Sequence, residues 1–250
     1  MTAVRGPVTG PVLGDPAPGD PTLGAKVLDN PVWASLTGRH AHLAERHGLA
    51  ARYQPDVAPF VALQDATDPR AWTDLADLLG PGATIVVTSP VLDVPAGWQA
   101  VERGEGVQLV DTHVEAGPPD ADVVRLTAAD VPELLDLTAR TAPGPFLPRT
   151  VELGTYLGIR REGRLVAMAG ERLQPPGWVE ISAVCTDPAH RGQGLASRLV
   201  RAVVHGIRER GEHPFMHAAA TNTNAIRLYE ALGFTLRRRT TFAAVRTPDA

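Results

Sequence analysis

The sequence predicts an α/β protein of two units, and three observations favour this fold class. With 44% hydrophobic and 21% charged residues among 250, the chain has the composition of a soluble folded protein. Apolar β-branched runs alternate along it with amphipathic helical segments. Consecutive prolines within residues 115–120 interrupt both patterns. We therefore expect a smaller α/β domain at 25–116 and a larger domain at 120–250.

The smaller unit is preceded by a segment rich in proline and glycine. Residues 1–24 are predicted to form a flexible tail, because repeated X-Pro and Gly steps prevent helical hydrogen bonding. Asn30 and Pro31 suit an N-cap and a first helical position, so a helix is expected from Asn30 to about Leu49. The other expected elements are a strand at 57–63, a helix at 68–79, a strand at 83–88 and a hairpin at 97–110 turning at 104–106.

Beyond the boundary the pattern is rich in strands at first and then alternates strand and helix. The expected strands are 123–126, 156–160, 165–172, 179–186 and 213–218, and the expected helices are 130–140, 195–210 and 225–232. In the helix at 195–210, Leu195, Leu199, Val203 and Ile207 recur on one face, so this helix should pack on a sheet.

Charge and residue usage argue against several classes of function. A net charge of −4 leaves no basic surplus for binding nucleic acid. There is neither an apolar run of about 18 residues nor a basic-then-apolar start, so no membrane span or signal peptide is expected and the protein is predicted to be cytoplasmic. The single cysteine, Cys185, is expected to be buried in a strand. His40, His42 and His47 lack zinc-protease spacing, so no metal is expected.

The glycine-rich turn before the helix at 195–210 carries the strongest chemical signal. Gly192 and Gly194 allow a ligand close to the backbone, and the first helical amides point outward at the positive end of the helix dipole. Such a helix start binds anions. A P-loop would need a lysine here, and the third glycine of a dinucleotide fingerprint would fall at Ser197. The alternative is a glycine-rich turn without a ligand.

Two motifs resemble one known family. The pattern Arg191-x-x-Gly194-x-Ala196 resembles the pyrophosphate-binding signature of the GCN5-related N-acetyltransferase (GNAT) superfamily. The segment 215–234, which ends in Leu-Gly-Phe, is similar to a second motif of that family. The resemblance covers roughly 123–245 and is nearest to the FR47-like branch. It implies an α/β (α+β) GNAT fold with a mixed, splayed central sheet. The unit at 25–116 lacks the signature, so even as a degenerate copy it should not bind the cofactor and would instead wall the acceptor cleft.

The resemblance also implies a set of residues that bind acetyl-CoA. The backbone of the glycine turn would contact the pyrophosphate, and the preceding strand would pair with the pantetheine arm and offer amides to the thioester oxygen. The alternatives are that Arg191 is only a solvated charge, that residues 184–186 form an ordinary core strand, and that Asn222 only caps a helix. The residues concerned are Val184, Cys185, Thr186, Arg191, Gly192, Gln193, Gly194, Leu195, Ala196, Ser197, Asn222 and Tyr229.

Three residues are candidates for catalysis. In the family motif the Tyr229 hydroxyl lies near the coenzyme sulfur, where it would protonate the departing thiolate; a core aromatic is the alternative. An amine must lose a proton before it attacks, and Glu180 and His217 occupy strand positions where relatives carry a base. The alternatives are a surface carboxylate and a structural histidine.

The predicted function is direct transfer of an acetyl group from acetyl-CoA to a primary amine of a small molecule. Phe146 and Arg149, in a proline-rich loop, are candidates for acceptor contacts, although a plain connector is the alternative. A protein or peptide N-acetyltransferase and a non-catalytic acyl-CoA sensor remain open as functions. No nucleic-acid or membrane partner is expected, and a homodimer is left open.

Overall fold

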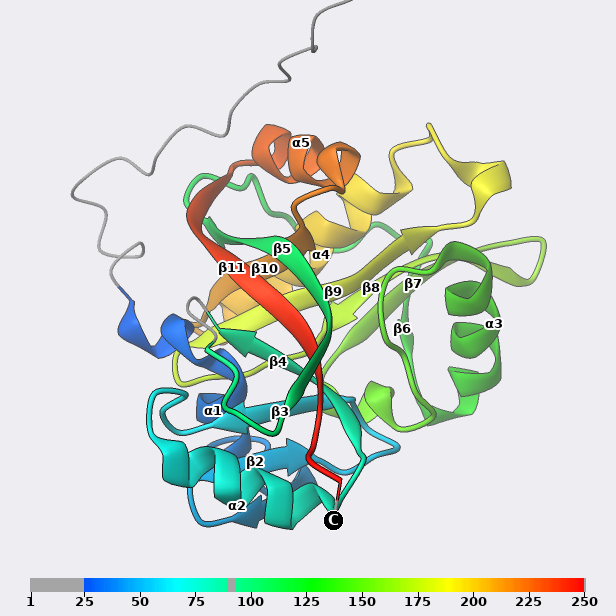
Figure 1. The fold of residues 1–250 in the computed structure, drawn as a ribbon. Helices are drawn as coiled ribbons and strands as arrows, with labels where there is room; N and C mark the ends of the chain where they lie inside the picture. The colour runs from blue at the N-terminus through cyan, green and yellow to red at the C-terminus, as the bar shows by residue number, and fades with distance from the viewer. Residues whose placement is uncertain (1–24, 90–92, 250) are drawn as a thin grey trace, which may run out of the picture.

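The computed structural model describes residues 25–89 and 93–249, so the predicted tail at 1–24 lies outside the described residues. The described strands form one mixed sheet of 11 strands, flanked by helices (Figure 1). The order across the sheet is β1-β2-β3-β4-β11-β5-β10-β9-β8-β7-β6. The predicted α/β class is confirmed.

The first unit is built from short elements. Asn30 caps α1 by accepting a hydrogen bond from the Trp33 amide, as predicted, but this helix ends at Leu36. The expected helix to Leu49 is therefore wrong, because the chain continues instead into a β-hairpin that turns at Gly48 with φ +49°. The elements are η1 (Lys26–Asp29), α1 (Pro31–Leu36), η2 (Ala41–Leu43), β1 (Ala44–His47), β2 (Ala50–Tyr53), β3 (Phe60–Leu63), α2 (Pro69–Leu79) and β4 (Thr84–Ser89).

The expected hairpin at 97–110 is also wrong. The segment forms one long strand, β5 (Gln99–Asp111), whose two glycines lie within the strand. It pairs on one side with β11 (Phe234–Arg246), a strand that the sequence did not predict, and on the other with β10 (His213–Ala219). A strand expected in the first unit thus lies among strands of the second, and the division into two domains stays a prediction.

The remaining elements follow the predicted order. They are β6 (Val123–Leu126), η3 (Ala128–Asp130), α3 (Val131–Thr141), η4 (Thr150–Leu153), β7 (Tyr156–Arg161), β8 (Arg164–Glu171), β9 (Trp178–Thr186), η5 (Pro188–His190), α4 (Leu195–Glu209) and α5 (Thr223–Leu232).

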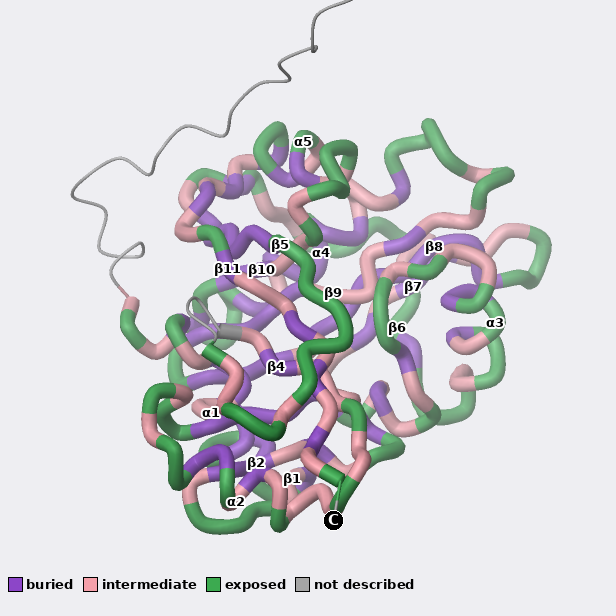
Figure 2. Tube along the Cα trace, in the orientation of Figure 1, coloured by how far each residue is buried: buried purple, intermediate pink, exposed green. Residues whose placement is uncertain are grey.

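The helices α3 and α4 cover opposite faces of the sheet. Along β8, Ala167 and Ala169 pack in the cluster that contains α4, whereas Met168 between them packs in the cluster that contains α3. This alternation follows from the two-residue period of a strand. Buried residues accordingly run along the central strands (Figure 2). In the described ranges, no helix combines the length and apolar character that crossing a membrane requires.

The sheet opens between β9 and β10. These strands pair in parallel over four residue pairs, ending at Ile181 and Met216. Just beyond, Ala183 has φ +53°, and the register of β9 against β8 shifts by one residue. A bulge of this kind bends the strand and leaves backbone groups unpaired. The predicted splay of the central sheet is therefore present, with its open end at residues 182–186.

The glycine positions in β5 lead to a test of the corrected strand. A Cβ on Gly106 would lie 2.0 Å from a ring carbon of Phe242, whereas a Cβ on Gly104 would meet nothing within 4 Å. We expect Gly106→Val to destabilise the fold by about 1–3 kcal/mol through overpacking, and Gly104→Val to have little effect. Urea unfolding of both variants checks this, and equal midpoints would contradict the pairing of β5 with β11.

Candidate active site

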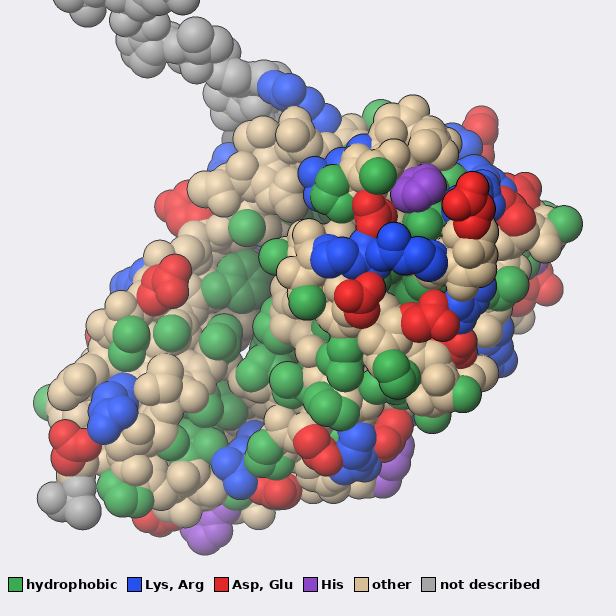
Figure 3. All heavy atoms as spheres, turned by 90° about the vertical axis from the view of Figure 1, so that its right-hand side faces the viewer, with side chains coloured by type: hydrophobic (Ala, Val, Ile, Leu, Met, Phe, Trp, Pro, Cys, Tyr) green, Lys and Arg blue, Asp and Glu red, His purple; other side chains and the backbone are tan. Residues whose placement is uncertain are grey.

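A cavity of about 490 Å³, the central cavity, lies where β9 and β10 diverge. Residues 181–184 of β9 and 217–219 of β10 form its sides, and residues 142–145 border it. Phe60 and Val86 reach it from the first unit, and Phe242 from β11. Figure 3 shows a hollow on one face of the molecule with hydrophobic side chains inside it.

A second cavity of about 220 Å³, the loop cavity, adjoins the first. Val184, Asn222 and Tyr229 line both cavities, so the two meet at these side chains. Thr186 and Arg191 line the loop cavity but not the central cavity. The loop cavity therefore extends towards the start of α4. The two cavities together form one cleft, which has one end at the start of α4 and the other end at the first unit.

The α4 start has the features of an anion site. Gly192 and Gly194 have φ +77° and +72°, as the sequence predicts for this turn, and no side chain caps the helix at Gly194. Uncapped amides at the positive end of a helix dipole suit a phosphate group. Arg191 donates from Nε to the Thr186 carbonyl at 3.3 Å and lines the loop cavity with Ala196.

The remaining loop residues differ in what they can offer. The Leu195 side chain packs into the core, so only its backbone faces outward. Gln193 is exposed and Ser197 is half-buried at the first turn of α4. These positions are compatible with contacts made by backbone amides, for which side-chain identity matters little.

Cys185 is buried in β9 and borders the loop cavity, as expected for a strand residue. Burial raises the pKa of its thiol to about 11. The thiol therefore stays protonated near neutral pH, which makes Cys185 a poor nucleophile.

Asn222 and Tyr229 come together through α5. The Asn222 side chain accepts a hydrogen bond from the Ala225 amide at 3.2 Å, so it caps α5 while lining both cavities. Burial, aided by the nearby Cys185, raises the pKa of Tyr229 to about 12. The phenol thus carries its proton at neutral pH, at the junction of the two cavities.

Glu180 is fully buried and belongs to a charged cluster. Arg172 donates from Nε and Nη2 to its two carboxylate oxygens at 2.8 and 2.6 Å, and His217 Nδ1 lies 2.7 Å from Oε1. Burial alone would raise the pKa of Glu180, but the charge and hydrogen bonds of Arg172 and the bond from His217 outweigh it and lower the pKa to about 2. The carboxylate is ionised and satisfied, so by itself it is a weak base.

The hydrogen-bond network fixes which nitrogen of His217 carries the proton. Arg237 donates from Nη1 to Gln108 Oε1 at 2.7 Å, which makes the Gln108 amide nitrogen a donor. That nitrogen lies 3.0 Å from His217 Nε2, so Nε2 accepts. The proton is therefore assigned to Nδ1, which donates to Glu180.

The two candidate bases thus form one network. The sequence could not reveal its other members, because Gln108 is separated by 109 residues from His217 and by 129 from Arg237. The Arg172–Glu180 pair spans only 8 residues, but it shows no motif.

The predicted acceptor residues lie elsewhere. Phe146 packs edge-on against Tyr156 in the α3 core, with ring centroids 5.5 Å apart. Arg149 donates to Gln54 at 2.7 Å and forms an ion pair with Glu152 at 2.7 Å. Neither is among the described residues that line the central or the loop cavity, and their acceptor role stays a prediction.

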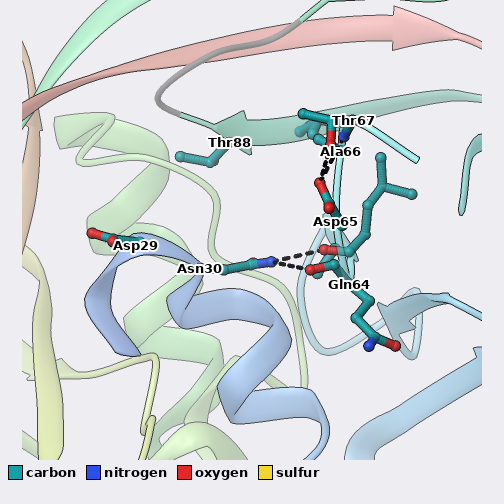
Figure 4. A pocket seen from close by; sticks show the side chains of 10 residues that line it. Asp29, Asn30, Gln64, Asp65, Ala66, Thr67 and Thr88 are labelled. Atoms are coloured by element: carbon teal, nitrogen blue, oxygen red, sulfur yellow. Dashed lines mark hydrogen bonds between the residues drawn. The ribbon is translucent and has the colours of Figure 1, made fainter. Parts of the chain in front are cut away.

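Another pocket, of about 220 Å³, lies between α1 and the ends of β3 and β4 (Figure 4). Asn30 points into it and donates to the Leu63 and Gln64 carbonyls, while Asp65 accepts from Thr67. These polar groups serve local turns and caps, so the pocket offers less chemistry than the cleft. No group of three His, Cys, Asp or Glu side chains within the described ranges is placed to hold a metal.

Comparison with known proteins agrees with this geometry. The family of FR47-like proteins matches residues 156–243. N-alpha-acetyltransferase RimI of Mycobacterium tuberculosis is 34% identical over 128 residues, covering 46% of this chain and 80% of that protein. A crystal structure described as a GNAT-family acetyltransferase, from Novosphingobium aromaticivorans, has 39% identity and a TM-score of 0.81, covering 89% of this chain and 99% of that one. The chain belongs to the GNAT family.

Another relative matches a shorter part of the chain. A mycothiol acetyltransferase of Thermomonospora curvata is 37% identical over 113 residues, which is 43% of this chain. The match spans 36% of that relative, about a third of its length. The family and the fold predicted from the two motifs are thus confirmed.

The buried, ionised Glu180 makes the free energy of unfolding depend on pH. The pKa of Glu180 is about 2 in the folded protein, against a usual 4.5. Its contribution to the free energy of unfolding is therefore complete above pH 4.5 and is lost as the pH falls towards 2. We expect Glu180→Gln to cost about 3–5 kcal/mol by leaving Arg172 unpaired, and to remove that part of the acid dependence. Urea unfolding from pH 2 to 7 checks this, with the exposed Glu230→Gln as control. A Glu180→Gln profile parallel to that of the wild type would contradict the ion pair.

Proposed function

We propose that this GNAT chain transfers an acetyl group from acetyl-CoA to the primary amine of a small molecule. The observation that carries the proposal is the two-ended cleft at the splay of β9 and β10. One end has the uncapped start of α4, and the other is walled by Phe60, Val86 and Phe242. A walled acceptor end suits a compact amine better than a folded protein.

The cofactor end would hold acetyl-CoA through backbone groups. The α4 amides and Arg191 suit its diphosphate, because the amides lie at the positive end of a dipole and the guanidinium adds charge. Beyond Ile181 the edge of β9 that faces β10 is unpaired, and its backbone groups suit the pantetheine amides. When bound, acetyl-CoA supplies a thioester carbonyl as the electrophile.

Tyr229 is proposed as the general acid. Its phenol is protonated at neutral pH and lies where the two cavities meet. A proton given from its oxygen to the departing sulfur would prevent a free thiolate from forming.

His217 is proposed as the base, with Glu180 acting through it. Nε2 of His217 is the nitrogen without a proton, and Glu180 holds the proton on Nδ1. Taking the amine proton on Nε2 requires the Gln108 amide to move aside, because both groups would then be donors. Water in the cavity is the alternative acceptor of that proton.

A protein N-terminus is the second candidate acceptor. The relative named N-alpha-acetyltransferase RimI, of which this chain covers 80%, favours it. The wall that Phe60 and Val86 build at the acceptor end favours the small molecule. Release of coenzyme A thiol with amines and with peptides, measured side by side, separates these candidates, and release with neither would favour an acyl-CoA sensor.

The location of the cofactor can be tested with two glycines that flank α4. Gly194 and Gly211 have φ +72° and +73°, and a Cβ on either meets nothing within 4 Å. Gly194→Trp should weaken acetyl-CoA binding about 100-fold by covering the helix start, whereas Gly211→Trp carries the same backbone strain outside the cleft. Calorimetric titration measures the affinity of both variants for acetyl-CoA, and a wild-type affinity in Gly194→Trp would exclude this cofactor site.

The acid role can be tested with a pair of buried tyrosines. Tyr229→Phe should lower kcat about 100-fold, the usual contribution of a positioned acid, and leave acetyl-CoA binding unchanged. Tyr156→Phe is the matched control, because the Tyr156 hydroxyl is buried without a hydrogen-bond partner among the described residues. Steady-state thiol release measures kcat, and equal values for the two variants would rule out Tyr229 as the acid.

A further inference from the structure

We infer that the acceptor is an amine that also carries a carboxylate, and that Arg172 binds this carboxylate in the central cavity. The inference rests on the proposed function and names its substrate class. Arg172 lines the central cavity and is not among the described residues of the loop cavity, so it belongs to the acceptor end.

The guanidinium of Arg172 is only partly used by the fold. Its Nε and Nη2 donate to Glu180, and its central carbon lies over the Phe60 ring, 4.9 Å from the ring centroid. No described residue accepts a hydrogen bond from Nη1. The side chain is 16% exposed and lines the cavity. A guanidinium has five N–H donors, and the two on Nη1 remain available to a ligand there.

The surroundings favour an anion at this place. Among the described residues that line the central cavity there is no Asp or Glu, and Arg172 brings the one permanently charged side chain. Phe60, Val86 and Phe242 make the rest of the acceptor end apolar. Since water is displaced by such a wall, a charge-assisted hydrogen bond to Nη1 is stronger than it would be at the surface. A ligand with a second positive charge would meet Arg172 and no carboxylate among the described residues that line this cavity.

The reaction leaves the carboxylate unchanged. The amine nitrogen forms a bond to the thioester carbon, the carbon–sulfur bond breaks with its electron pair going to sulfur, Tyr229 protonates the sulfur and the amine proton goes to His217 or water. The carboxylate therefore serves to bind and orient the amine. The α-amine of a peptide is followed by a neutral amide, so this feature also separates small amino acids from protein acceptors.

The test compares matched acceptors on the wild-type enzyme. A panel of amino carboxylates of different chain length is assayed by thiol release, each beside its primary amide. We expect kcat/KM to be about 10- to 100-fold higher for at least one carboxylate than for its amide, mainly through KM. Arg172→Lys keeps the positive charge beside Glu180 but removes the forked pair of donors that binds a carboxylate, so it should remove this preference. Arg160→Lys, whose side chain pairs with Asp130 outside the cleft, is the control.

The outcomes separate the inference from the proposed function. Equal or better use of the amides would overturn the anion site while leaving amine acetylation in place. If no amine is acetylated, the proposed function fails, and calorimetric binding of an N-acetylated amino carboxylate and its amide in the presence of coenzyme A decides the anion site. Tighter binding of the carboxylate supports it, and equal binding overturns it. Because both comparisons use the wild type, they hold even if Arg172→Lys does not fold.

Discussion

The parallel pairing of β9 with β10 ends after four residue pairs, and the geometry of the cleft depends on that early end. Had the ladder continued, the backbone of residues 182–186 would be satisfied within the sheet and no cavity would separate the strands. The bulge at Ala183 turns β9 away while β8 still holds its other edge. One irregular residue thus exposes a row of donors and acceptors and opens the space that a thioester and an amine would share.

A buried polar chain holds the acceptor side of this opening in one arrangement. It runs from Arg172 through Glu180, His217 and Gln108 to Arg237, and joins β9, β10, β5 and β11. Each member is hydrogen-bonded to the next, and such pairing is the condition under which buried charge is tolerated. The same arrangement limits the chemistry: Glu180 is ionised but occupied, and the proton on His217 is assigned to Nδ1. The donors on Nη1 of Arg172 are not used by this network, and Arg172 lines the central cavity.

Local features of the chain could be predicted because their causes are local. The positive φ values of Gly192 and Gly194, the caps at Asn30 and Asn222 and the long amphipathic α4 each follow from a few neighbouring residues. The failures have distant causes. Gly104 and Gly106 look like a turn, yet they lie in β5 because β11, more than 120 residues later, pairs with that segment. The segment after Leu36 has helical spacing, but residues 44–47 pair with residues 50–53 as the hairpin of β1 and β2, and Leu43 and Leu49 lie just outside these strands.

The sequence by itself determined the family motifs, the glycine-rich start of α4 and the presence of Asn222 and Tyr229 in one segment, because these depend on short-range geometry. Only the tertiary structure decided that Glu180 and His217 form one hydrogen-bonded pair, that Arg172 and Phe60 face the same cavity, and that Phe146 packs in the core. The physical reason is that hydrogen bonds and burial between distant strands are set by register across the sheet. The pattern of a single segment carries no record of that register.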